Sequence, residues 1–201
     1  MDFFVQYWRN VIINIRSACV EDAHEIAKVY IDTWRSTYPG ILPDKVLLEM
    51  SIERQIAIWV RAIKHSRGPT DEKILVLEKD DKNIIGISSC GFNRDRKTNF
   101  DGEVYTLYVH PDHQGHGYGK DLLFYLFDIL LTQNYRSVII WTLRDNPSRF
   151  FYEAMSGKRI GERQGKTWGL ILNEIAYGWS DLSTYIKSYK AGSTNYIELI
   201  K

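Results

Sequence analysis

The stretch LYVHPDHQGHGYGKDLL, residues 107–123, connects a predicted strand to a predicted helix through a glycine-rich loop. The strand has to end at His110-Pro111, because proline has no amide hydrogen to donate to a sheet. From Tyr118 to about Asn134 apolar residues recur every three or four positions, which predicts a long helix packed on a core. The first amides of such a helix have no partner within it, and the helix dipole is positive there. We therefore expect the loop to bind an anion such as a diphosphate, through the residues Gln114, Gly115, His116, Gly117, Tyr118, Gly119 and Lys120.

Two common phosphate-binding loops do not fit these residues. The nucleoside triphosphate loop needs four residues between its first glycine and Gly-Lys, followed by Ser or Thr. Here Gly115 is one residue too close to Gly119-Lys120, and Asp121 occupies the hydroxyl position. The dinucleotide pattern G-x-G-x-x-G fails because the third residue after Gly117 is Lys120. The loop therefore indicates neither a mononucleotide nor a NAD site.

The rest of the chain alternates between short β-rich runs and helical periodicity. Strands are predicted at residues 11–16, 73–79, 83–91, 103–109, 137–142, 159–164 and 168–179. Helices are predicted at residues 19–34, 44–65, 118–134 and 146–155. Strands joined through helices usually run parallel and those joined by short turns antiparallel. This order predicts an α/β fold with a central mixed, mostly antiparallel sheet of about seven strands and helices on both faces.

Length and composition favour one domain, which we place at residues 1–180 of the 201. Residues 181–201 form an extension of uncertain structure, in which DLSTYIKSYK (181–190) fits a helix and NYIELI (195–200) a short strand.

The formal net charge is +1, which gives no reason to expect nucleic acid or an anionic membrane as partner. No apolar run approaches about 18 residues, and the N-terminal stretch lacks a signal-peptide cleavage pattern, so we expect a cytoplasmic location. Cys19 and Cys90 are too far apart for a disulfide framework or a zinc knuckle. The three-residue spacing of His110, His113 and His116 is interpreted as chance, and no metal site is predicted.

Two segments together resemble a known family. Gln114, Gly117 and Gly119 fit the pattern Gln-x-x-Gly-x-Gly, and NPSRFFYEAMSGKRIGE (146–162) follows one strand later. Both resemble the GNAT superfamily of acetyl-CoA-dependent N-acetyltransferases, whose second segment reads Asn-Pro-(Ala/Ser)-Arg-x-Phe-Tyr-Glu-x-Leu-Gly-Gly. Met155 and Ser156 depart from that pattern at the end of the helix. The resemblance spans roughly residues 11–179 and is strongest over 100–160.

The resemblance implies a GNAT-like fold and an enzyme that moves an acetyl group from acetyl-CoA to a primary amine. We expect a small-molecule acceptor and direct attack within a ternary complex. It also implies that the strand ending at Val109 splays from its parallel neighbour, so that the pantetheine arm pairs with its free backbone groups. The coenzyme residues implied are Leu107, Tyr108, Val109, the loop from Gln114 to Lys120, Asn146 and Phe151. For Asn146, capping the following helix and binding the pantetheine both remain open.

Two side chains are catalytic candidates by the same resemblance. Tyr152 matches the tyrosine placed beside the coenzyme sulfur as general acid, and its alternative is a packed helix tyrosine. Glu103 resembles the base that accepts the amine proton through water, and its alternative is a solvated or salt-bridged glutamate at a strand end. Strand alternation predicts that Glu103 faces the same side as Tyr105, Leu107 and Val109.

The acceptor pocket is expected at the connection between the first two helices and at the final strands. Its predicted residues are aromatic: Trp34, Tyr38, Tyr105 and Trp168. For Trp34, packing in the core is the alternative. Other functions that remain open are a non-catalytic acyl-CoA-binding regulatory module, a protein N-terminal or lysine acetyltransferase, and a structural oligomerisation domain. A homodimer is also left open.

Overall fold

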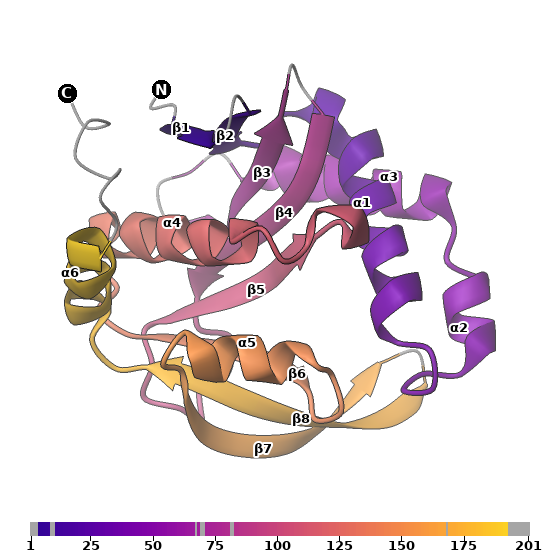
Figure 1. Cartoon of the computed structure of the whole chain (residues 1–201). Helices are drawn as coiled ribbons and strands as arrows, with labels where there is room; N and C mark the ends of the chain where they lie inside the picture. Colours follow the sequence, from indigo (N-terminus) through magenta and orange to yellow (C-terminus); the bar gives the residue numbers. More distant parts are fainter. Residues whose placement is uncertain are drawn as a thin grey trace.

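A computed structural model describes residues 4–8, 11–66, 68, 71–80, 83–167 and 169–192. Its described strands form one eight-stranded sheet in the order β1-β2-β3-β4-β5-β6-β8-β7 (Figure 1). The strands are β1 (Phe4–Trp8), β2 (Val11–Ser17), β3 (Lys73–Lys79), β4 (Asn83–Phe92), β5 (Gly102–Val109), β6 (Val138–Leu143), β7 (Lys158–Thr167) and β8 (Leu170–Trp179). All neighbours pair antiparallel except β5 and β6. The prediction of a mixed, mostly antiparallel sheet is confirmed. The structure adds one strand to the seven predicted, β1, which pairs with β2 as a hairpin.

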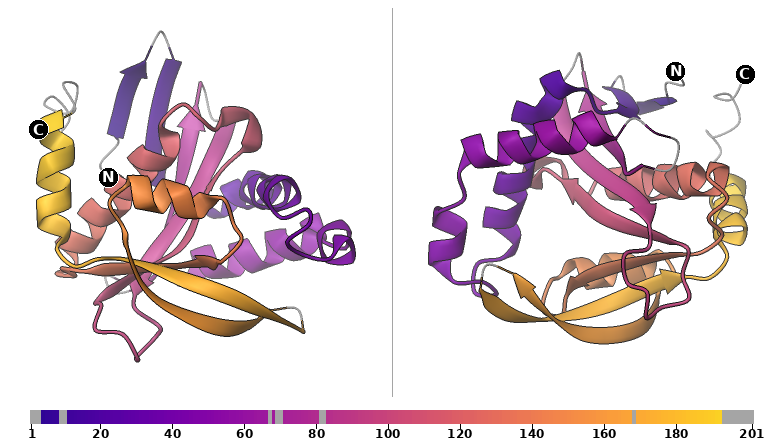
Figure 2. Two further views of the ribbon diagram at one scale, coloured as in Figure 1. Left: turned by 60° about the horizontal axis from the view of Figure 1, so that its bottom comes forward. Right: turned by 180° about the vertical axis from the view of Figure 1, so that it is seen from behind.

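Helices cover both faces of the sheet, as predicted (Figure 2). The helical segments are η1 (Val20–Asp22), α1 (Ala23–Thr37), α2 (Asp44–Leu48), α3 (Ile52–His65), η2 (Pro111–His113), α4 (Tyr118–Thr132), α5 (Ser148–Ala154) and α6 (Leu182–Gly192). Helices α1 and α3 pack on one face, and α4, α5 and α6 on the other. The single helix expected over 44–65 is wrong, because Ser51 takes an extended conformation and caps α3 by accepting from the Arg54 amide at 3.2 Å. None of the helices among the described residues is long and apolar enough to cross a bilayer.

Strands β5 and β6 are paired over a short length only. The parallel register joins Gly102 to Val138, Glu103 to Ile139 and Val104 to Ile140, and then stops. On its other side β5 stays paired with β4 as far as Val109. The two strands therefore diverge after residue 104, and the predicted splay of the strand that ends at Val109 is confirmed. We call the space between them the wedge.

A β-bulge in β5 changes which face its side chains occupy. Ser89 of β4 pairs with Thr106 and the next residue, Cys90, pairs with Val104, so Tyr105 is an extra residue in β5. As a result Val104 and Leu107 pack in the same core under α4, although they are three residues apart. Glu103 lies on the opposite face from Leu107 and Val109, and the expectation that they share a face is wrong.

The C-terminal helix belongs to the main core. Leu182, Ile186 and Tyr189 of α6 are buried with the α4 residues Phe124 and Phe127. The ring of Tyr189 stacks on Phe124 with centroids 3.9 Å apart. The helix predicted in DLSTYIKSYK is confirmed, and the core continues past residue 180. The strand predicted in NYIELI falls outside the described residues.

Candidate active site

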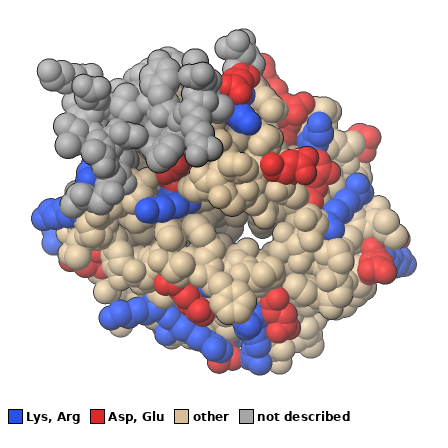
Figure 3. Space-filling view, in the orientation of Figure 1, with Lys and Arg blue, Asp and Glu red and all other residues tan. Residues whose placement is uncertain are grey.

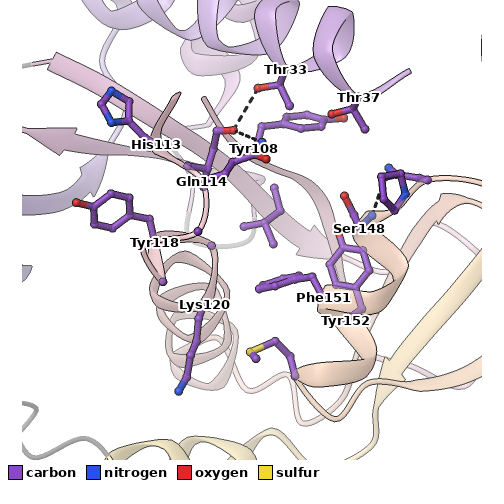
Figure 4. Close-up of a pocket in the computed structure, with 18 of the residues that line it drawn as sticks. Thr33, Thr37, Tyr108, His113, Gln114, Tyr118, Lys120, Ser148, Phe151 and Tyr152 are labelled. Carbon is purple, nitrogen blue, oxygen red and sulfur yellow. Dashed lines mark hydrogen bonds between the residues drawn. The ribbon is translucent and has the colours of Figure 1, made fainter. Parts of the chain in front are cut away.

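The principal cavity lies in the wedge and has a volume of about 530 Å³. In the space-filling view the surface is hollowed near the centre of the molecule, while most charged side chains lie around the periphery (Figure 3). Helix α1 contributes Thr33 and Thr37 from one side, and α5 contributes Phe151 and Tyr152 from the other (Figure 4). The other lining residues come from β5, η2, the glycine-rich loop, the start of α4, the residue after α1 and both ends of α5: Tyr38, Leu107, Tyr108, Val109, His113, Gln114, Gly115, Gly117, Tyr118, Gly119, Lys120, Asn146, Pro147, Ser148 and Met155.

The glycine-rich loop presents backbone amides at one end of the cavity. Gly115 and Gly117 have φ of +78° and +89°, a left-handed conformation that side chains with a Cβ seldom adopt. The first amides used by the α4 ladder are those of Lys120 and Asp121, which donate to the Gly117 carbonyl at 2.9 and 3.2 Å. The amides of residues 115–119 precede this ladder. Lys120 lines the cavity here, but its ammonium group lies over the Tyr189 ring of α6, 4.8 Å from the ring centroid. This arrangement suits a diphosphate.

His113 also lines this end of the cavity, although the sequence analysis named it only within a histidine spacing interpreted as chance. Burial lowers the pKa of His113, and the nearby positive groups Lys79 and His110 lower it further. The imidazole is therefore uncharged at neutral pH.

The end of β5 forms one side of the wedge, which we call the β5 side. The His110 amide donates to the Ile85 carbonyl of β4 at 2.8 Å, so by strand alternation the Val109 peptide groups point away from β4 toward the cavity. The Val109 carbonyl accepts from Gln114 Nε2 at 2.9 Å and from Thr33 Oγ1 at 3.4 Å (Figure 4). Gln114 thus ties the loop to the strand.

The start of α5 forms the opposite side of the wedge, which we call the α5 side. Asn146 is buried, and its Oδ1 accepts from the Ser148 amide at 2.8 Å while its Nδ2 donates to the Tyr38 hydroxyl at 3.0 Å. The capping role left open for Asn146 is therefore present, and its contact with pantetheine stays a prediction. Tyr152 lies one turn after Ser148, and its ring packs edge-on against Phe151 and Trp179.

Three phenols meet at the inner end of the cavity. Burial raises the pKa of Tyr152 and of Tyr38, and the neighbouring Tyr108 raises both further. Burial also raises the pKa of Tyr108 to about 12, against an opposing hydrogen bond from Trp34. All three are neutral at pH 7, so this end offers hydroxyl groups that donate hydrogen bonds without carrying charge.

Two predicted residues, Glu103 and Tyr105, do not line this cavity. Both Glu103 carboxylate oxygens are engaged by Arg94, with Nη2 to Oε1 at 2.7 Å and the backbone amide to Oε2 at 2.9 Å. Tyr105 donates its hydroxyl to the Phe92 carbonyl at 2.6 Å, and the Arg94 guanidinium lies 3.8 Å above its ring. Glu103 therefore occupies the salt-bridged position considered as its alternative.

Of three further predicted site residues, two are not among those that line the cavity. Trp34 packs beside Tyr38, with ring centroids 4.5 Å apart, and is not a lining residue of the cavity. His116 stacks on Tyr118 at 5.7 Å, outside the lining. Trp168 falls outside the described residues.

The hydroxyls of Thr33 and Thr37 were missed by sequence reasoning. They share a helix face with two apolar residues, Ile26 and Tyr30. Tyr30, Thr33 and Thr37 follow Ile26 by four, seven and eleven positions, which places all four on one side of the helix. Hydroxyl residues on an otherwise apolar helix face were the available signal.

Comparison with known proteins agrees with this geometry. Residues 26–157 match the sequence model of the acetyltransferase (GNAT) family. A Bacillus subtilis (strain 168) protein, uncharacterized N-acetyltransferase YuaI, is 32% identical over 172 residues, which cover 86% of this chain and 95% of that protein.

Solved structures share the fold. The PaiA N-acetyltransferase from Thermoplasma acidophilum, in complex with coenzyme A, superposes with a TM-score of 0.64 at 21% identity, covering 83% of this chain and 99% of that one. The yncA structure from Salmonella typhimurium, with its cofactor acetyl-CoA, gives a TM-score of 0.60 at 19% identity, covering 85% of this chain and 94% of that one.

Proposed function

Because the chain belongs to the GNAT acetyltransferase family, we propose that it transfers the acetyl group of acetyl-CoA to a primary amine of a small molecule. As a family member it is an acyltransferase, and acetyl-CoA is its acetyl donor. The observation that carries the proposal is the cavity in the wedge, with loop amides at one end and the neutral Tyr152 hydroxyl further in. The phenol rings of Tyr38, Tyr108 and Tyr152, which enclose the end of the cavity away from the loop, support a small acceptor.

The residues present fit the coenzyme. The left-handed glycines at 115 and 117 expose the amides that a diphosphate needs, and the unpaired edge of β5 offers hydrogen-bonding groups to an extended amide arm. Acetyl-CoA supplies the acetyl group as an activated thioester. The Val109 N–H faces the cavity. There it donates a hydrogen bond to the thioester carbonyl oxygen, which gains negative charge as the amine attacks.

Tyr152 acts as a hydrogen-bond donor in this proposal. Its raised pKa keeps the proton on the phenol throughout the neutral range. Even at the reference pKa values, a phenol is a weaker acid than a thiol by about 2 kcal/mol. Tyr152 is therefore favoured to donate a hydrogen bond to the departing coenzyme thiolate over transferring its proton completely.

Loss of the acceptor's proton needs a separate route. An alkylamine has a reference pKa of about 10.4, so its free base costs roughly 4 to 5 kcal/mol to form at pH 7. Glu103 is outside the cavity lining and is held by Arg94, so a proton that reaches it travels through water. We retain Glu103 as the base in that indirect role.

A panel of amines, assayed for release of free thiol from acetyl-CoA, tests the function. The panel holds small primary amines, a lysine-containing peptide and a peptide with a free N-terminus. We expect turnover with at least one small amine. Turnover confined to peptides would contradict the small-molecule acceptor. Calorimetric binding of acetyl-CoA without turnover on any amine would identify a non-catalytic module instead.

A further inference from the structure

Helix α1 and the residue that follows it contact both sides of the wedge. On the β5 side, Thr33 Oγ1 donates to the Val109 carbonyl at 3.4 Å. Past the helix end, the Tyr38 hydroxyl accepts from Asn146 Nδ2 at 3.0 Å on the α5 side. Tyr38 and Asn146 are 108 positions apart in sequence, so this bond joins segments that neither a helix nor a sheet ladder connects.

The surroundings of Tyr38 fix the position of its hydroxyl. Its side chain is 5% exposed, and its ring lies 4.5 Å from that of Trp34. The same apolar cluster brings the turn between α1 and α2 against β6 and β8, through Leu42, Leu47, Leu143, Leu170 and Leu172. A buried hydroxyl on a packed ring has little freedom to find another partner.

The Asn146 amide is oriented by bonds at both of its polar atoms. Oδ1 accepts from the Ser148 amide at 2.8 Å, and Nδ2 donates to Tyr38 at 3.0 Å. Reversing the amide would bring its NH₂ group against the Ser148 N–H, two donors facing each other, and the bond that caps α5 would be lost. Ser148 is the first residue of α5, and Tyr152 follows four residues later on the same side of the helix.

We propose that Tyr38 is a positioning residue for the acetyl transfer. Its hydroxyl holds Asn146 and the first turn of α5 so that Tyr152 faces the Val109 peptide across the wedge. Tyr38 therefore acts on catalysis through α5. The effect on turnover rests on the proposed function, while the effect on α5 does not.

Tyr38→Phe removes one oxygen and keeps the ring. We expect kcat to fall about tenfold, the change that corresponds to one buried hydrogen bond of about 1.4 kcal/mol. We expect KM for acetyl-CoA to stay within about threefold, because the loop amides are untouched. Hydrogen exchange of the α5 amides should be faster than in the wild type. Tyr185→Phe is the matched control, because its hydroxyl bonds from α6 to the Ser156 carbonyl past the C-terminal end of α5, whereas the Tyr38 bond is at the N-terminal end.

Two substitutions of Asn146 separate its two bonds. Asn146→Asp keeps an acceptor for the Ser148 amide and a second oxygen that accepts from Tyr38, so it should retain more activity. Asn146→Ser can cap α5 but is too short to reach Tyr38, so it should match Tyr38→Phe. Tyr38→Phe combined with Asn146→Ser should be no slower than either single variant, since both remove the same bond.

Turnover and α5 exchange unchanged by Tyr38→Phe would overturn the proposal, and so would additive losses in the double variant. Hydrogen exchange needs no acceptor. If the wild type acetylates no amine, the proposed function fails, while the exchange of α5 still decides whether Tyr38 positions it.

Discussion

Tyr152 differs chemically from a catalytic acid that gives up its proton, since burial and Tyr108 raise its pKa. Tyr152→Phe should therefore lower kcat by about tenfold or more with little change in acetyl-CoA affinity, because only the hydroxyl is lost. Steady-state thiol release and calorimetry measure the two quantities. Unchanged turnover would remove Tyr152 from the mechanism.

Gly117 shows how the loop depends on backbone conformation. A Cβ at this position would meet nothing within 4 Å, so Gly117→Ala causes conformational strain without a clash. With φ at +89° that strain is about 1 kcal/mol, and its relief would turn the neighbouring amides. We expect acetyl-CoA affinity to fall severalfold in calorimetry. Gly161→Ala in β7 has no positive φ and should bind like the wild type.

Among the elements, the junction of β2, η1 and β3 depends on a half-buried ion-pair network. Arg16 contacts both carboxylate oxygens of Asp22, at 2.7 and 2.8 Å, and also pairs with Glu78. Burial alone would raise the pKa of Asp22, but hydrogen bonds from Arg16 and from the Cys19 amide outweigh it and lower the pKa. The pair therefore stabilises the fold fully above the unfolded pKa of about 3.9, and its contribution is lost as pH falls through the lower folded value.

Asp22→Asn should reduce the free energy of unfolding by about 2 kcal/mol at pH 7, and the difference from the wild type should shrink as pH falls below about 3.9. Urea denaturation across this range measures both effects. Glu49→Gln is the control, because its pair with Lys45 is highly exposed and contributes about 0.5 kcal/mol or less. A difference that grows toward low pH would show that the Asp22 carboxylate does not stabilise the fold through its charge.

The elements themselves were largely readable from periodicity, and the exceptions have physical causes. The α4 helix follows from its apolar spacing, and the loop before it from three glycines in five residues. The bulge at Tyr105 has no glycine or proline to announce it, so simple alternation placed Glu103 on the wrong face. The break before α3 depends on Ser51 acting as a cap, a competition that apolar periodicity does not register.

At the scale of the molecule, the loop end of the cavity was predictable because its residues are contiguous in sequence. The opposite end was less predictable, since it depends on contacts such as that of Tyr38 with Asn146, which only the folded chain brings together. The place of α6 in the core was also not predicted, because the domain was expected to end at residue 180. This helix lies outside the family match at residues 26–157 and still completes the core.

Ile186→Ala tests whether α6 is integral to the domain. Ile186 is 6% exposed within the core under α4, and removing such a side chain costs about 2 to 4 kcal/mol. For a chain of this size we expect Tm to fall by about 4 to 16 °C in calorimetry. Lys187→Ala, one position on and exposed, should leave Tm nearly unchanged. Equal effects of the two substitutions would mean that α6 is only loosely attached.

The gap between β5 and β6 links the stability of the fold to binding of the coenzyme. A sheet that leaves hydrogen-bonding groups of one strand without a neighbour is completed by whatever occupies the gap, so binding there favours the folded state. At a ligand concentration a hundred times the dissociation constant the gain is about 2.7 kcal/mol. Proteolysis of the purified protein through its opened state should therefore slow when acetyl-CoA is added at such a concentration.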